Sequence, residues 1–332
     1  MLWLVVPLGV LIGVVGLGGI YQALATSRDS RRFVPPGKLI QINGKNWHSQ
    51  IMGKGHPTVI VDSGTGGTHL DWQLVQPEVA KFTKILTYDR AGYGWSTISS
   101  EPRTAQQVVS ELRQLLREVE IEPPYVLVGM SLSGLFSRLF AYHYPEEVVG
   151  MVLVDVAHEK MYEETPVESV ELNKRLEGLL THVVPIMGRI GLLRLLVTFD
   201  SVPMAAGLFQ KFPPSIRPLA KALYSQTQFG KTFAQESAAV SVSMNQVKQI
   251  RQTKPFPDIP LIVLSSGKSD FDITQDVLQK LQKLHADLAK ESPQGVHIVA
   301  HESGHAIQLE KPELVIDAIR QVVEKVRCSS DP

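Results

Sequence analysis

The chain is poor in cysteine and has no excess of charge of either sign, and each absence excludes a class of protein. Cys328 is the only cysteine among 332 residues, so no disulfide can form within the chain. Its place in the polar C-terminal tail indicates a surface thiol and not a nucleophile. Basic and acidic residues number 33 each, and this balance gives no indication of a nucleic-acid partner. The length suits one α/β domain that carries an insertion.

Charge is also missing from the start of the chain. Residues 2–25 carry no charged side chain and are almost continuously apolar. About 20 such residues suffice for a helix to cross a bilayer. The first charges, Arg28 to Arg32, follow this run, so the positive-inside tendency predicts a single-pass anchor over 1–27 with the body of the protein in the cytoplasm. Ala23-Leu24-Ala25 also fits a signal-peptidase site, which leaves export after cleavage as the alternative.

A buried strand that turns sharply into a helix is the centre of the remaining chain. Tyr125-Val126-Leu127-Val128 has no polar face, as in a strand covered on both sides. The segment 129–134, which reads GMSLSG, interrupts it, and helical spacing begins at Leu135. Such a turn exposes the side chain at its tip and directs the N-terminus of the helix to the same place. Ser131 is therefore a candidate nucleophile, although a glycine- and serine-rich loop without chemistry, or one that cradles a phosphate, has the same composition.

Two segments carry a resemblance to a known family. The segment around Ser131 resembles the nucleophile elbow G-x-S-x-G of the α/β-hydrolase superfamily, with Ser133 in place of the last glycine. Residues 88–96, YDRAGYGWS, are similar to the segment that follows the fourth strand in that superfamily. There the pair Asp89 and Arg90 would fix the loop and take no part in catalysis. The resemblance implies an α/β-hydrolase fold: an eight-stranded, mostly parallel sheet with flanking helices and an inserted helical cap.

The same resemblance implies a division of the chain. After the anchor, residues 28–37 form a stiff linker with Pro35-Pro36. The core takes residues 38–157 and 257–327, and the cap takes residues 158–256. Two apolar stretches of the cap, 183–187 and 190–197, form either a roof over an acyl chain, resting on a membrane surface, or the core of the cap itself.

The resemblance also assigns the site residues. Ser131, Asp270 and His305 follow one another in the superfamily order of nucleophile, acid and base. Asp270 follows the strand at 261–264, with Asp272 as the near alternative and Asp155, at the end of an earlier strand, as the more distant one. The oxyanion would be bound by two backbone N–H groups, which belong to Thr65 in the loop after the strand at 58–61 and to Leu132 in the elbow.

The segment around His305 also contains a metal-binding pattern. His301-Glu302-Ser303-Gly304-His305 spells H-E-x-x-H, which binds zinc only when both histidines lie on one face of a helix. A strand that runs to Val299 and the glycine at 304 both disfavour a helix here. We therefore expect no metal and no other cofactor.

The expected function is that of a serine hydrolase. An activated serine attacks the carbonyl of a small apolar carboxylic ester, and water releases the acyl-enzyme. Amides, thioesters and carbon–carbon bonds are alternative targets of the same triad. A binding protein without catalysis is the alternative from a different class. A serine at the elbow argues against dehalogenase and epoxide hydrolase chemistry, for which an aspartate nucleophile would be expected.

Overall fold

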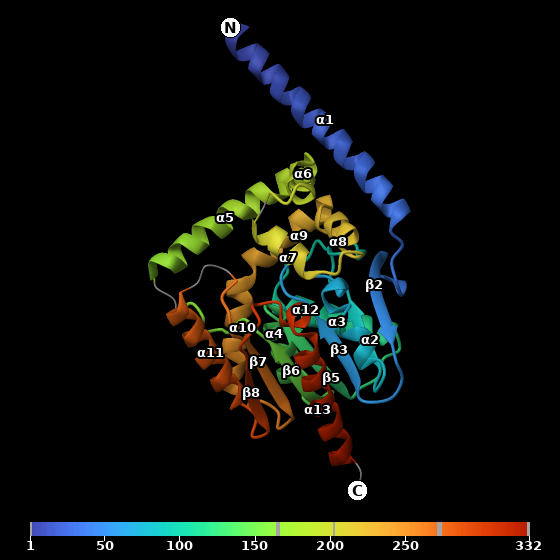
Figure 1. Ribbon diagram of the computed structural model, residues 1–332, viewed down its shortest axis with the longest axis vertical. Helices are drawn as coiled ribbons and strands as arrows, with labels where there is room; N and C mark the ends of the chain where they lie inside the picture. Colours follow the sequence, from blue (N-terminus) through green and yellow to red (C-terminus); the bar gives the residue numbers. More distant parts are fainter. Residues whose placement is uncertain (1, 164–166, 202, 271–273, 331–332) are drawn as a thin grey trace.

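Eight strands form one mixed sheet at the centre of the molecule (Figure 1). The computed structural model describes residues 2–163, 167–201, 203–270 and 274–330. The strands are β1 Lys38–Ile42, β2 Lys45–Met52, β3 Thr58–Asp62, β4 Ile85–Tyr88, β5 Tyr125–Met130, β6 Val148–Val154, β7 Leu261–Ser266 and β8 Gly295–Ala300. Their order is β1-β2-β4-β3-β5-β6-β7-β8; β1 and β2 pair antiparallel, and every pairing from β4 to β8 is parallel. The predicted fold is thereby confirmed.

Local sequence explains two features of this sheet, the hairpin at its edge and the buried strands at its centre. Asn43 and Gly44 join β1 to β2 with φ angles of 50° and 75°, the left-handed pair that a two-residue hairpin turn needs. The central strands β3, β4, β5 and β7 are buried at every position, which explains their continuous apolar runs. Because β3 to β8 are parallel, their carboxyl ends share one edge of the sheet, where α/β folds place their ligands.

Helices cover both faces of the sheet. They are η1 His69–Trp72, α2 Gln76–Val79, α3 Ala105–Glu118, α4 Ser133–His143, α11 Gln275–Ala289, α12 Ile307–Glu310 and α13 Pro312–Ser330. Apolar residues of α3, α4 and α11 share one core cluster with the sheet, whereas those of α2 and α13 share the cluster on the other face. The Thr104 hydroxyl caps α3 by accepting from the Gln107 N–H.

Six helices lie between β6 and β7 in the chain. They are α5 Val167–Arg189, α6 Leu192–Thr198, α7 Pro203–Lys211, α8 Arg217–Tyr224, α9 Thr227–Ala238 and α10 Val240–Thr253. Figure 1 shows α5 to α9 beyond the edge of the sheet, whereas α10 runs back beside it. Met244 and Val247 of α10 belong to the core cluster of α3 and α4. The end of the expected cap segment thus packs as part of the core.

The N-terminal residues form one long helix, α1 Leu2–Arg32. It continues through residues 28–32, which were expected in the linker, since no proline occurs between Pro7 and Pro35. Its C-terminal half contacts the cap helices, where Gln22 donates to the Ser225 carbonyl at 2.8 Å and Arg194 pairs with Asp29 at 2.5 Å.

The described residues contain no single helix with both the length and the apolarity of a membrane span. One pair of helices, Gly178–Arg189 and Leu192–Thr198, meets the criterion only jointly and is bent by 89°. The predicted single-pass anchor is therefore not supported, and export after cleavage stays a prediction.

Candidate active site

Ser131 stands at the tip of the turn between β5 and α4. Its φ of +55° is the left-handed conformation that is strained for a residue with a side chain and that is found at functional turns. Close packing fixes the turn, because a Cβ on Gly129 would lie 2.9 Å from the Ser133 carbonyl and one on Gly134 would lie 2.4 Å from Val156. Neither position accepts a larger residue without movement.

The departure at Ser133 has a structural explanation. Its side chain is fully buried, and its hydroxyl oxygen accepts from the Met130 N–H at 2.7 Å. The same oxygen lies 2.9 Å from the Asp62 carbonyl at the end of β3, to which it can donate. The serine thus ties the elbow to the neighbouring strand, a contact that a glycine would not make.

The loop after β3 lies against the nucleophile. A Cβ on Gly64 would come within 2.9 Å of the Ser131 Cβ, so only glycine permits this approach. Trp72 Nε1 donates to the Ser63 hydroxyl at 3.0 Å, and that hydroxyl donates to the Thr68 carbonyl. The loop is therefore held from behind by side-chain and backbone contacts.

Arg90 holds the same loop from the side. Its guanidinium donates to the carbonyls of Ser63 and Gly64 and pairs with Asp62 at 2.5 Å and with Glu236 of α9 at 2.9 Å. All of these side chains are buried. Asp89, expected to fix its loop together with Arg90, binds two histidines.

The two expected oxyanion donors, the backbone N–H groups of Thr65 and Leu132, belong to the two segments that meet at Ser131. Thr65 follows Gly64 in the loop, and Leu132 is the N-cap of α4. Among the described residues, neither backbone N–H donates to a protein acceptor. Two unpaired N–H groups beside a serine suit the binding of a developing oxyanion.

His305 meets a different aspartate from the one expected. Its Nδ1 lies 2.6 Å from Oδ2 of Asp155, which follows β6 directly and has a φ of 44°. The other oxygen of Asp155 accepts from the Ser266 N–H at 2.8 Å. Burial alone would raise the pKa of Asp155, but the hydrogen bond and charge of His305, the nearby His285 and the Ser266 N–H outweigh it and hold the pKa below its usual value.

Asp270 contacts the backbone of His305 and not its ring. Its Oδ2 accepts from the His305 N–H at 2.9 Å and forms an ion pair with Lys211 of α7 at 2.6 Å. Lys211 also pairs with Glu310, whose second oxygen accepts from the Gly304 N–H at 2.8 Å. Two carboxylates thus hold the loop that carries the histidine, and a cap lysine neutralises them. Asp272, the near alternative, lies outside the described residues.

The H-E-x-x-H segment has the loop conformation that was expected. Residues 301–305 contain turns and no helix, and Glu302 pairs with Lys311 on the surface. His301 and His305 are therefore not placed one helical turn apart.

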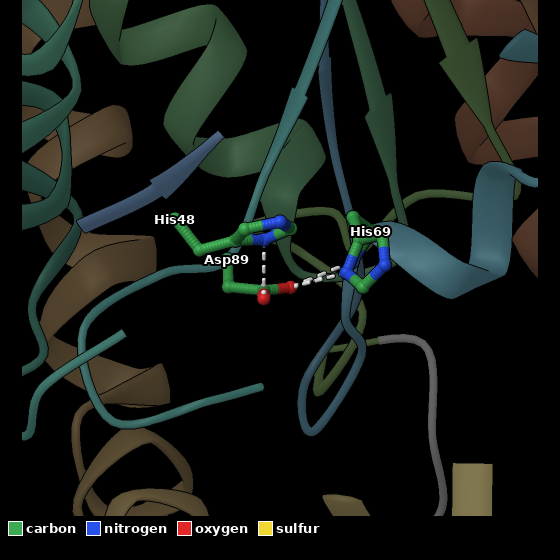
Figure 2. Close-up of side chains that lie close together, drawn as sticks. All are labelled: His48, His69 and Asp89. Carbon is green, nitrogen blue, oxygen red and sulfur yellow. Dashed lines mark hydrogen bonds and ion pairs between the residues drawn. The ribbon is translucent and has the colours of Figure 1, made fainter. Parts of the chain in front are cut away.

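A second group of possible metal ligands is formed by His48, His69 and Asp89. Figure 2 shows the Asp89 carboxylate between two imidazole rings, with His48 Nδ1 at 2.7 Å and His69 Nδ1 at 2.9 Å. Two histidines and a carboxylate are a donor set that metals accept. However, the Asp89 oxygens also accept from the backbone N–H groups of His69 and Trp95, and Nε2 of His48 lies 2.5 Å from the Pro36 carbonyl. These contacts account for the cluster as a buried tie between β2, η1 and the loop after β4.

The cluster perturbs the pKa values of its members. Burial alone would raise the pKa of Asp89, but His69 and His48 lower it far below its usual range. Burial alone would lower the pKa of His48, but Asp89 and the Pro36 carbonyl outweigh it and raise the pKa. The carboxylate therefore stays ionised throughout the physiological range.

A third group of carboxylates is already neutralised. His158, Glu159 and Glu291 lie close enough to share an ion. Arg138 and Arg251 each form ion pairs with both glutamates, at distances of 2.7 to 3.4 Å. These pairs connect α4, α10 and the segments that follow β6 and α11.

Aromatic side chains of the cap reach the loop that carries Thr65. A Cβ on Gly66 would lie 3.3 Å from the Phe233 ring and 3.4 Å from the Phe229 ring. Phe229 belongs to an apolar cluster that extends to Ala306, the neighbour of His305. The cap therefore packs aromatic side chains against the loop of Thr65 and belongs to one apolar cluster with the neighbour of His305.

The comparisons with known proteins agree with this architecture. The alpha/beta hydrolase family matches residues 59–318, which is more than half of the chain, and the protein belongs to this family. The chain is 27% identical to the uncharacterized protein YqjL of Bacillus subtilis (strain 168) over 286 residues, which covers 86% of this chain and 91% of YqjL.

Solved structures with the same fold have different activities. A thermophilic esterase from Thermogutta terrifontis superposes with a TM-score of 0.64 and 19% identity, over 87% of this chain and 97% of the esterase. A putative epoxide hydrolase from Pseudomonas aeruginosa superposes with a TM-score of 0.69 and 14% identity, over 87% and 95% of the two chains. Identities this low show a shared fold, so the reaction must be argued from the site.

Proposed function

We propose that the protein is a serine hydrolase that cleaves a carboxylic ester through an acyl-enzyme intermediate. The observation that carries the proposal is the meeting of three chain segments at the carboxyl edge of the sheet. Ser131 stands on a strained turn after β5, and the pair of His305 and Asp155 joins the segments after β8 and β6. The Ser131 N–H donates to the Val154 carbonyl, and the Ala157 N–H donates to the Ser131 carbonyl, so the elbow and the Asp155 turn are directly joined.

Each residue has a role in acyl transfer. His305 accepts the proton of the Ser131 hydroxyl as the oxygen attacks the ester carbonyl, and the imidazolium then protonates the leaving alcohol. The N–H groups of Thr65 and Leu132 bind the oxyanion of the tetrahedral intermediate. Water, activated by the same histidine, hydrolyses the acyl-enzyme and restores the serine.

Asp155 takes the role of the triad acid in this proposal, in place of Asp270. It accepts the Nδ1–H of His305, which leaves Nε2 as the basic nitrogen, and its ionised form stabilises the imidazolium. The contact of Asp270 with His305 is to the backbone N–H, so Asp270 can fix the loop but not the tautomer of the ring.

The substrate class follows from the apolar surface of the cap. Phe229 and Phe233 lie beside Gly66 and pack in an apolar cluster with Leu70, Leu309 and other side chains of core and cap. An apolar acyl or alcohol group would gain free energy by leaving water for this surface. An ester is preferred over an amide or a thioester because esters are the commonest substrates of such sites, which is an argument from analogy.

Labelling with a fluorophosphonate probe tests the proposal. We expect the wild type to be labelled, and Ser131→Ala and His305→Ala to lose labelling. Ser137→Ala is the matched control, because Ser137 is a buried serine of α4 outside the triad, and it should keep labelling. A wild type that melts cooperatively but is not labelled would contradict the proposal and favour a binding protein on this fold.

A further inference from the structure

A chain of hydrogen bonds connects the turn of Asp155 to the outer part of the sheet. His285 of α11 is 3% exposed, and its Nε2 lies 2.7 Å from the carbonyl of Val156, the residue after Asp155. Its Nδ1 lies 2.7 Å from the Ser265 hydroxyl, which in turn lies 2.7 Å from Nε2 of the half-buried His297 on β8. The chain therefore begins beside Asp155 and ends near the surface.

The acceptors fix where the protons are in the neutral chain. A carbonyl can only accept, so Nε2 of His285 carries a proton, and Nδ1 of the neutral ring is an acceptor. The Ser265 hydroxyl must then donate to His285, and its oxygen accepts from Nε2–H of His297. Each polar group of the chain is satisfied, and both rings have the Nε2–H tautomer.

The same atoms also satisfy a second protonation state. When a proton binds to Nδ1 of His297, the Nε2–H proton of that ring can pass to the Ser265 oxygen while the Ser265 proton passes to Nδ1 of His285. One proton has then entered at the surface and one charge has appeared on His285. All three hydrogen bonds persist: the two that involve Ser265 reverse their direction, and Nε2–H of His285 still donates to the Val156 carbonyl. The cation would lie 3.9 Å from Oδ1 of Asp155.

We propose that His285 is a positioning residue for Asp155, and that His297 and Ser265 deliver a proton to it that reduces catalysis at acidic pH. In the neutral state His285 holds the Val156 carbonyl and so the turn that presents the acid to His305. In the protonated state its charge competes with the imidazolium of His305 for the Asp155 carboxylate, which weakens the stabilisation of the transition state. This proposal rests on the proposed hydrolase function.

The other titratable groups around His285 do not produce the same loss of rate at acidic pH. Asp155 and His158 face it from the segment after β6, and His297 faces it from β8, while β7 has no titratable residue. Burial lowers the pKa of His158 to about 4, so that this residue stays neutral during assays above pH 5. Burial and the charge of His285 lower the pKa of His297. Of the groups that face His285, His297 is thus the one that can share the extra proton with it.

The pH dependence of labelling by the fluorophosphonate probe tests the proposal. Loss of rate on the acid side should approach a slope of about 2 in the wild type, because the base and the chain each bind a proton. His285→Gln keeps a donor for Val156 and an acceptor for Ser265 but cannot become charged, so its slope should fall to about 1 with a rate at pH 8 close to wild type.

A second pair of variants separates positioning from proton delivery. His285→Leu removes the contact with Val156 and cannot become charged, so it should lower the maximal rate at pH 8 about tenfold, with little change in substrate affinity and an acid slope of about 1. His182→Gln, at an exposed histidine of α5, is the control and should leave the profile unchanged. An unchanged slope in His285→Gln, or an unchanged rate at pH 8 in His285→Leu, would overturn the proposal.

Nuclear magnetic resonance of 15N-histidine in the full-length protein tests the chain of hydrogen bonds with a readout that does not depend on activity. The signals are assigned by their loss in the His285→Gln and His297→Gln variants. At pH 8 we expect both rings in the Nε2–H tautomer, and on acidification we expect a charged His285 beside a neutral His297 in the Nδ1–H tautomer. A Nδ1–H tautomer of His285 at pH 8 would overturn the proposal, whereas a wild type that is not labelled but shows the expected tautomers would contradict only the proposed function.

Discussion

Asp155 and Asp270 follow neighbouring strands of the sheet but have different environments. Asp155 comes directly after β6, and its backbone N–H donates to the Leu264 carbonyl of β7 at 2.8 Å. Asp270 comes four residues after the end of β7, on a surface loop, where Lys211 of the cap pairs with it. Strand contacts therefore fix the first carboxylate, while the second depends on the position of the cap.

The difference shows how the position of a residue after its strand affects its role. A side chain one residue beyond a buried strand inherits the rigidity of the sheet, which a catalytic hydrogen bond to His305 needs. A side chain farther along a loop can reach another element, and Asp270 reaches both Lys211 and the backbone of His305. The first arrangement suits orientation of an imidazole, and the second suits a contact between cap and core.

Exchanging each carboxylate for its amide gives the largest expected effect. Asp155→Asn should lower the labelling rate about 10³- to 10⁴-fold, because asparagine stabilises neither the required tautomer nor the imidazolium of His305. Asp270→Asn should lower it by less than about tenfold, because it weakens the contact with the His305 backbone and the ion pair with Lys211 but leaves the ring of His305 with Asp155. The measurement is the second-order rate of labelling at pH 8, with thermal melts to confirm folding. The reverse ranking would restore Asp270 as the triad acid.

Removing the cap lysine should have a smaller effect. Lys211→Met leaves Asp270 and Glu310 without their shared cation and loosens the loop of His305, so we expect a rate about three- to tenfold lower. Lys221→Met is the matched control, because Lys221 has a similar exposure but pairs with Asp200 inside the cap. Its rate should be unchanged. Both variants should lose no more than about 1 kcal/mol of unfolding free energy.

A double variant sharpens this test. Lys211→Met combined with Asp270→Asn removes the repulsion between two carboxylates and should recover part of the rate that Lys211→Met loses. If the rates of the two single variants simply multiply, Lys211 and Asp270 do not act as one contact.

The pH dependence of stability gives the smallest expected effect. The pKa of Asp155 is lower in the folded protein than in the unfolded chain, so this group contributes stability above the unfolded value of about 4 and loses it as the pH falls through the folded value. Asp155→Asn should therefore narrow the difference in unfolding free energy between pH 6 and pH 3. Urea titrations at both pH values measure it, and a difference equal to that of the wild type would contradict the assignment.

Much of the fold was predictable because its signals are local. The turn at Asn43-Gly44, the apolar run of β5 and the small residues around Ser131 each determine a conformation within a few residues. The nucleophile segment and the His305 segment were found for the same reason. The length of α1 was predicted less well, since no residue between Ala25 and Arg32 stops a helix and cap contacts hold its last turns.

The partners of the site residues were not predictable in the same way. Arg90 was expected to fix a loop together with Asp89, but no pattern indicated its pairing with Glu236, which is 146 positions away. The contact of His285 with Val156 spans 129 positions, and no motif marks it. Such contacts depend on which loops meet after folding, and a single sequence contains no pattern that reports this.

The sequence by itself determined the class of fold, the place of Ser131 and the order of the segments that carry chemistry, because strand and turn patterns are set by neighbouring residues. Only the tertiary structure decided which carboxylate faces His305. Asp155 and Asp270 both follow strands that end at the same edge of the sheet, and their residue types are identical. The choice depends on the distance of each side chain from the imidazole, which parallel packing of β6, β7 and β8 sets and which no local pattern encodes.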